Sequence, residues 1–191
     1  MDSISLDNTK LFPFSESALQ MNMDPTNNQL LMAIKGGNIQ NAKALILSGI
    51  EINCKDNFNR TPLHFAAVFG FLEIVKMLIA KDAKIDAKEI NGCTPLHVAA
   101  LKGNSLVLEM LLQNGANIKA QTNAGCTPLH FAAGFIGFSN EPAKTLEILI
   151  QNGASLKIRT NNGFAPFEYA LQANTSNMER LKCFKALCYK K

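Results

Sequence analysis

Apolar residues recur at helical spacing between residues 61 and 80. Leu63, Ala66 and Ala67 form a narrow apolar face, and after Gly70 a second apolar stripe follows, made by Ile74, Val75, Leu78 and Ile79. Spacings of three and four residues bring side chains to one side of an α-helix. The pattern predicts two short helices that cover each other's apolar faces, with small alanines that allow close packing.

The same pattern returns twice further along the chain. Thr-Pro-Leu-His-Phe-Ala-Ala starts at Thr61, and similar segments start at Thr94 and Thr127, so that each start lies 33 residues after the one before. Thr is a good N-cap, and Pro directly after it occupies a position whose N–H has no helical partner. Each copy therefore predicts a helix start, and the period indicates a stack of repeats that bury a continuous core.

The two ends of this region are atypical, as expected where one side of a stack meets water. Residues 28–49 keep the apolar rhythm without the Thr-Pro-Leu-His motif and predict an N-terminal capping unit. Residues 165–171 keep the proline but replace Thr and His, and they predict the final unit. In its second helix we expect Leu181, Phe184 and Leu187 on the inner face.

These motifs resemble the ankyrin-repeat family over residues 28–191, because Thr-Pro-Leu-His-x-Ala-Ala is followed by Asn-Gly-Ala at residues 114–116 and 152–154. The resemblance implies an all-α solenoid of stacked helix-turn-helix units with projecting hairpin loops. About five units are expected, at residues 28–55, 56–88, 89–121, 122–159 and 160–191. The resemblance also implies that the hairpin arms and first helices form a concave surface for partners.

Two segments depart from the repeat. The distance from Gly115 to Gly153 is 38 residues instead of 33, and the five extra residues lie within residues 134–142. Glycines, Ser-Asn and Pro142 favour a loop and an early restart of the second helix. The insertion is either a tolerated loop or a partner contact made by Phe135 or Phe138. Residues 1–27 precede the repeats and are interpreted as a flexible leader, an addition to the cap, or a targeting segment.

Composition places the chain among ordered, soluble proteins. Hydrophobic residues make up 47% of the 191 residues and charged residues 18%, which argues against disorder. The five cysteines show neither a metal-binding spacing nor a disulfide framework, which favours a reducing, intracellular setting. We expect the cytoplasm rather than the nucleus, with secretion into a host cell as an effector left open. No apolar stretch approaches the length of a membrane span, so membrane insertion is not expected.

Charge is uneven along the chain. Residues 1–27 contain four acidic residues and one lysine, so they carry −3, and the total of +4 leaves +7 for residues 28–191. Lys55, Lys88 and Arg159 share one repeat position, which Gln121 interrupts, and acidic neighbours offset the first two. A nucleic-acid groove needs continuous basic residues with stacking aromatics. Nucleic acid is therefore not expected as a partner.

Few residues suggest catalysis or metal binding. The three histidines, His64, His97 and His130, each occupy the fourth place of the motif, and the resemblance implies that they make local hydrogen bonds between units. Groups spaced by a whole repeat lie along a ladder and do not converge on one metal ion. Cys93 and Cys126, also one repeat apart, are expected as neighbouring free thiols. No phosphate loop or nucleophile motif occurs, so we expect no catalytic residues, no metal, no cofactor and no enzymatic activity.

Large side chains at positions that the fold does not dictate are the candidates for partner binding. They are Phe58, Arg60, Phe69, Ile90, Leu101, Lys102, Phe135 and Phe138. If the apolar members are exposed together, they form the kind of patch that marks an interaction site. The competing interpretation is that some of them pack internally.

The predicted function is a monomeric protein-binding module, acting as an adaptor, an inhibitor or an intracellular effector through its hairpin and first-helix face. The alternative from another class is a structural unit that organises a larger assembly through its end caps, signalled by an exposed apolar cap helix.

Overall fold

The computed structural model describes residues 28–134 and 142–173, and these residues contain no β-strand. The chain is thus all-α over these ranges, as predicted. The helices are α1 (Gln29–Lys35), α2 (Ile39–Leu47), α3 (Pro62–Phe69), α4 (Leu72–Ala80), α5 (Pro95–Lys102), α6 (Ser105–Gln113), α7 (Pro128–Gly134), α8 (Pro142–Gln151) and α9 (Pro166–Ala173).

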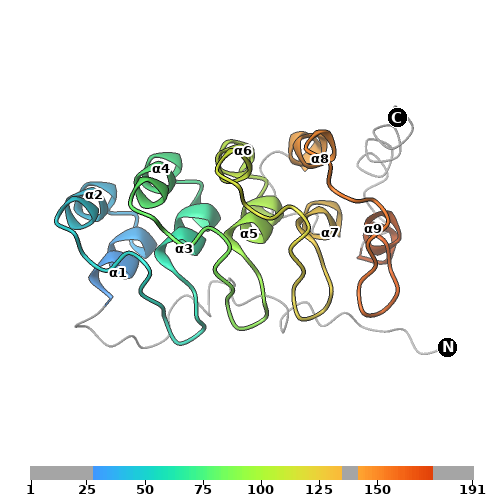
Figure 1. The fold of residues 1–191 in the computed structure, drawn as a ribbon, viewed down its shortest axis with the longest axis horizontal. Coiled ribbons are helices and arrows are strands. Elements are labelled where there is room, and N and C mark those ends of the chain that lie inside the picture. Colours follow the sequence, from blue (N-terminus) through green and yellow to red (C-terminus); the bar gives the residue numbers. More distant parts are fainter. Residues whose placement is uncertain (1–27, 135–141, 174–191) are drawn as a thin grey trace.

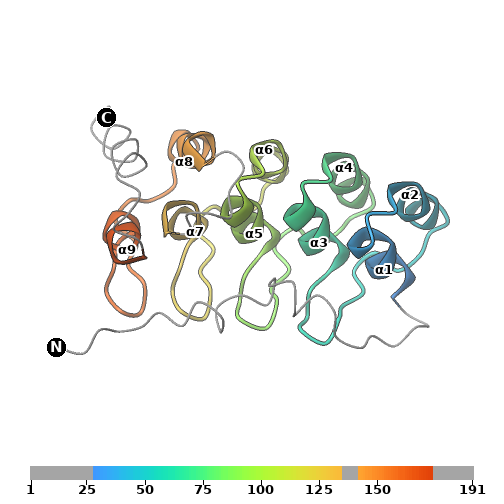
Figure 2. The same cartoon turned by 180° about the vertical axis from the view of Figure 1, so that it is seen from behind.

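The helices form two parallel layers (Figure 1). The first helices of the pairs, α1, α3, α5, α7 and α9, make one layer, and α2, α4, α6 and α8 make the other. Long loops project from the first layer on the side away from the second, and the view from behind shows the same order along the stack (Figure 2). This is the predicted solenoid of helix pairs with projecting hairpins.

Helix starts and ends follow the local chemistry of the motif. Thr61 and Thr94 have extended N-cap conformations, and Pro62 and Pro95 are the first helical residues behind them. Gly70 ends α3 with φ of 71°, a left-handed conformation that costs a residue with a Cβ about 1 kcal/mol or more. The restart at Pro142 is also confirmed, since α8 begins there.

One core runs through the stack. It contains Leu63, Ala66 and Ala67 of α3, Ile74 and Leu78 of α4, and the corresponding residues of the neighbouring pairs, all buried. Because each helix pair covers the apolar face of the next, stability is shared between neighbours.

Several predicted features lie outside the described residues. They are the leader at residues 1–27, Phe135 and Phe138 of the insertion, and the expected inner face made by Leu181, Phe184 and Leu187.

Candidate interaction surface

Four hairpin arms project from the layer of first helices, at residues 48–61, 81–94, 114–127 and 152–165. Each arm closes near its tip with a pair of backbone hydrogen bonds. In the second arm the Glu89 N–H donates to the Cys93 carbonyl at 3.0 Å, and the Gly92 N–H donates to the Glu89 carbonyl at 2.8 Å. Gly92 has φ of 81°, a left-handed conformation that favours glycine; at the equivalent place of the first arm Asn59 adopts it with φ of 61°.

Backbone hydrogen bonds also join each arm tip to the next. The Ile90 N–H donates to the Phe58 carbonyl at 2.9 Å, the Asn123 N–H to the Asn91 carbonyl at 2.9 Å, and the Asn161 N–H to the Ala124 carbonyl at 3.0 Å. The side-chain amide of Asn123 adds a bond to the Ile90 carbonyl at 3.0 Å. The Asn161 side-chain amide donates to the Asn123 carbonyl in the same way, at 2.9 Å. The tips therefore form a continuous main-chain ladder, which these asparagine side chains supplement.

The motif histidines join successive units, as the family resemblance implied. In His64 the ring Nδ1 accepts from the Thr61 backbone N–H at 3.1 Å, so the ring proton lies on Nε2, which donates to the Cys93 carbonyl at 3.1 Å. His97 and His130 make the equivalent bonds to the carbonyls of Cys126 and Phe164, both at 3.0 Å. Each ring thus connects the start of one first helix to the following arm.

Burial keeps these histidines neutral. Removal from water lowers the pKa of His64 to about 4 and that of His97 to about 3, and it lowers the pKa of His130 as well. A proton on Nδ1 would also face the Thr N–H that now donates to it. The histidines are therefore structural groups, not proton-transfer or metal-binding groups.

Arg60 does not lie on the surface, contrary to its place among the expected partner contacts. Its side chain is 1% exposed, and its guanidinium lies 2.6 Å from Asp56 Oδ2 and 4.8 Å from the ring centres of both Phe58 and Phe65. A charge in this position needs a partner because an isolated buried charge is strongly unfavourable. Arg60 fixes the first arm against α3.

The second arm carries different residues at the positions of Asp56 and Arg60. Glu89 corresponds to Asp56 and Cys93 to Arg60, one repeat later. Glu89 is 3% exposed, and its Oε1 accepts from the backbone N–H groups of Asn91 and Cys93, whereas its Oε2 is buried without a hydrogen bond. Burial raises the pKa of the Cys93 thiol, and the nearby Glu89 carboxylate raises it further. The cysteine is therefore a poor nucleophile.

Phe58 and Ile90 lie at adjacent arm tips. Ile90 is 53% exposed, and Phe58 is half-buried with one face of its ring on Arg60. The positions equivalent to Ile90 hold Asn57, Asn123 and Asn161. An exposed isoleucine among asparagines is not required by the ladder, which uses only its backbone. These two residues form the part of the predicted patch that lies together.

The other candidates within the described residues do not join this patch. Leu101 is 2% exposed and belongs to the core, so the alternative that some candidates pack internally holds for it. Phe69 is 36% exposed but lies at the end of α3, seven residues beyond its start at Pro62, and stacks on Phe71 with ring centres 5.5 Å apart. At about 1.5 Å per residue, this places Phe69 roughly 10 Å along the helix from the arm. Lys102 is partly buried at the end of α5.

At the repeat position shared by Lys55, Lys88 and Arg159, two of the basic side chains contact groups of the same chain. The ammonium group of Lys88 donates to the Gln121 carbonyl of the next arm at 3.2 Å. Arg159 lies 2.6 Å from Glu168 of α9, an exposed pair, and hydrogen bonds from the Ala165 N–H and from Arg159 lower the pKa of Glu168. Both basic side chains are thus held against neighbouring parts of the chain.

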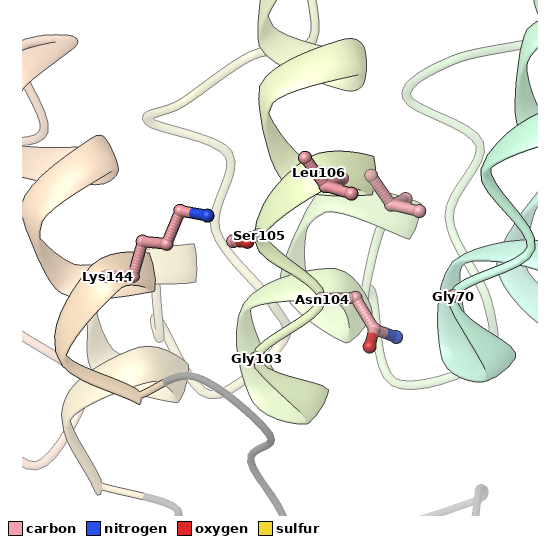
Figure 3. A pocket seen from close by; sticks show the side chains of 7 residues that line it. Gly70, Gly103, Asn104, Ser105, Leu106 and Lys144 are labelled. Carbon is pink, nitrogen blue, oxygen red and sulfur yellow. The ribbon is translucent and has the colours of Figure 1, made fainter.

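A groove of about 260 Å³ lies on a different side of the stack, between α3, α6 and α8 (Figure 3). It is lined by Gly70, Gly103, Asn104, Ser105, Leu106, Val107 and Lys144. Asn104 points toward α3, where its amide donates to the carbonyls of Ala67 at 2.7 Å and Val68 at 3.0 Å. Among the described residues that line the groove, Lys144 is the one ionisable residue, so these residues bring no acid and base together.

Sequence reasoning missed four exposed apolar side chains, one of which, Leu171 of α9, is 45% exposed. Met32, Leu47 and Leu106 are 56%, 69% and 57% exposed. Met32 occupies the repeat position of Phe65, which the preceding arm covers through Arg60. The signal for Leu106 was available in the alignment of the repeats, since the equivalent residues Gln40, Glu73 and Lys144 are all polar.

Other kinds of site find no support in the ranges that the structure describes. These ranges contain no group of three or more His, Cys, Asp and Glu side chains placed to hold a metal ion. Cys54, Cys93 and Cys126 are free thiols, which confirms the expectation for the latter two. No helix within the described residues is long and apolar enough to cross a membrane.

Comparison with known families agrees with this architecture. A family model described as three copies of ankyrin repeats matches residues 30–122, and a model described as a single ankyrin repeat matches residues 124–161. No match to this chain was found among the curated proteins.

Proposed function

Because the chain belongs to the ankyrin-repeat family, whose members generally mediate protein–protein interaction, we propose that it binds another protein through its hairpin arms. Ile90, with Phe58 beside it, is the proposed centre of the contact. We further propose that the protein acts inside cells as a monomeric adaptor, inhibitor or effector without catalytic activity. Its units span residues 28–55, 56–88, 89–121, 122–159 and 160–191.

The observation that carries this proposal is the exposure of Ile90. A side chain that is 53% exposed at a position where the other arms have asparagine contributes nothing to the backbone ladder. Partly exposed apolar side chains at such a prominent place gain free energy when a partner covers them, about 25 cal/mol per Å² of apolar surface removed from water. The rigid arms keep the entropic cost of binding low.

The test uses Ile90→Asn, which installs the residue that the neighbouring arms already carry and so preserves the ladder. The matched control is Leu106→Gln, which removes an equally exposed leucine from α6, in the other helix layer, and installs the residue found at Gln40. Both variants and the unchanged chain are used for affinity capture from a cell lysate, after circular dichroism and thermal unfolding have shown that they fold alike.

We expect a captured protein that still binds Leu106→Gln. Its affinity for Ile90→Asn should be at least about tenfold lower, as for a central contact residue. A partner that Ile90→Asn binds as tightly as the unchanged chain would refute the proposed face.

A second candidate function is a structural unit joined to others through its end cap. The exposure of Met32 and Leu47, both in the first helix pair, favours it. Light scattering at increasing protein concentration separates the two functions: self-association that disappears in Met32→Ser/Leu47→Ser supports the assembly unit, whereas a concentration-independent monomer supports the binding module.

A further inference from the structure

The hairpin-arm face carries an excess of exposed positive charge. Seven basic residues of the arms are exposed, against three exposed acidic ones. The basic residues are Lys55, Lys81, Lys84, Lys88, Lys119, Lys157 and Arg159, and the acidic ones are Glu51, Asp82 and Asp86. Arg159 is offset by Glu168 of α9, so six basic residues remain against the three acids. Two of those acids accept hydrogen bonds from backbone N–H groups, Glu51 from Asn53 and Asp86 from Asn117. The face is therefore suited to an acidic segment.

An acidic segment belongs to the same chain. Residues 1–27 contain Asp2, Asp7, Glu16 and Asp24 against the single Lys10, a net charge of −3. They also contain apolar residues for a surface that exposes Ile90, such as Leu11, Phe12 and Phe14. Acidic and apolar side chains thus occur together in this segment, as they would in a ligand for the arms.

The place where this segment joins the described structure favours the same face. It is followed by Asn28, the N-cap of α1, and α1 lies in the layer of first helices from which the arms project. Each later first helix is preceded by an arm, and the arm before α3 covers Phe65 through Arg60. The equivalent Met32 is 56% exposed. The chain before Asn28 is thus connected to α1 at the position that, before α3, holds the covering arm.

The length of the segment is sufficient to reach every arm. At about 3.3 Å per residue, 27 residues span up to about 90 Å. The stack from α1 to α9 comprises four steps between first helices, about 40 Å at 8–10 Å per step. A tether of this kind gives an effective concentration of about 1 mM, so even a weak contact is substantially occupied.

We propose that residues 1–27 bind the hairpin-arm face of their own chain and compete there with the protein partner. The inference rests on the proposed function for the identity of the competing ligand, but not for the contact itself. With a dissociation constant of about 0.1 mM for the separate segment, an effective concentration of about 1 mM lowers the apparent affinity of any competitor about tenfold.

The experiment measures binding of a fluorescent synthetic peptide of residues 1–27 to the full chain by anisotropy. Two forms of the chain are compared: the unchanged chain, and Asp2→Asn/Asp7→Asn/Glu16→Gln/Asp24→Asn, whose own leader is neutral. A third form adds Lys55→Ser, Lys88→Ser and Lys119→Ser to the neutral leader. Its matched control adds Lys76→Ser alone, an exposed lysine on α4.

We expect the peptide to bind the neutral-leader chain about tenfold more tightly than the unchanged chain. This binding should be lost with the three arm substitutions and retained with Lys76→Ser, and it should weaken as salt rises. Equal binding to the first two forms, no binding to either, or binding unaffected by the arm lysines would each overturn the proposal.

The outcomes for the two proposals can be told apart. If the peptide experiment fails while Ile90→Asn still loses the captured partner, the arm face binds a partner without competition from the leader. If the peptide binds as expected and no partner depends on Ile90, the self-contact stands and the proposed function falls.

Discussion

Lowering the pH from 7.5 to 5 is expected to destabilise the stack by about 4 kcal/mol through His64 and His97 alone. Both rings are fully buried and neutral, with pKa values lowered to about 4 and about 3. In the unfolded chain each histidine titrates near pH 6.5. Between pH 6.5 and 4 the unfolded state therefore binds more protons than the folded state, and stability falls as the pH falls through this window.

The magnitude follows from the difference in proton binding. At pH 5 an unfolded histidine with a pKa of about 6.5 is almost fully protonated, whereas His64 and His97 in the folded state remain largely neutral. The linkage relation gives a loss of about 2 kcal/mol per histidine between pH 7.5 and 5. Domains typically have 5–15 kcal/mol of stability, so about 4 kcal/mol is a large fraction of it.

The assay is urea unfolding followed by circular dichroism at pH 7.5, 6.5, 6 and 5, with constant ionic strength. The variant His97→Gln separates this effect from the titration of other groups. It should be less stable than the unchanged chain at pH 7.5, because the bond to the Cys126 carbonyl is altered, yet it should lose about 2 kcal/mol less on going to pH 5. An identical pH-dependent loss in the two proteins would refute the assignment to the buried ring.

Two further predictions concern the arms. Gly92→Ala should lower the unfolding free energy by at least about 2 kcal/mol, because a Cβ there would lie 2.7 Å from the side-chain oxygen and 2.9 Å from the backbone nitrogen of Asn123. The control is Gly115→Ala, at φ of 87° with no atom within 4 Å of the added Cβ, which should lower the unfolding free energy by only about 1 kcal/mol. If urea titrations gave the same loss for both variants, the close contact at Gly92 would have no effect on stability. Arg60→Ala should lower the unfolding free energy by about 3–5 kcal/mol, because it leaves the Asp56 carboxylate buried without its cation. Thermal unfolding measures this loss, and a loss below about 1 kcal/mol would mean that the pair is dispensable.

The repeat pattern was sufficient to predict the fold. The three Thr-Pro-Leu-His copies determine where α3, α5 and α7 begin, since a capping Thr and a Pro at the first position leave little choice. The early start of α8 was predictable from Pro142 for the same reason. Local chemistry of this kind acts within a few residues, so the sequence alone reveals it.

The candidate site was harder to predict because exposure depends on neighbouring units. Arg60 was expected at the surface as a charged residue in a variable position, but Asp56 four residues earlier and the rings of Phe58 and Phe65 make its burial possible. Leu101 was a candidate for the surface with internal packing as the alternative, and it belongs to the core, as does most of the apolar content of the first helices. Ile90 was placed correctly on the surface, because an arm tip has no unit in front of it.

The backbone ladder at the arm tips separates recognition from folding. Since the main-chain N–H and carbonyl groups hold each tip beside the next, an exposed tip side chain that does not bond to the ladder, such as that of Ile90, can be replaced without shifting its neighbours. A new residue at such a position would then be presented on the same frame at little cost in stability. The arms thus behave as interchangeable display positions, and grafting tip residues is the simplest way to redirect this scaffold to a chosen target.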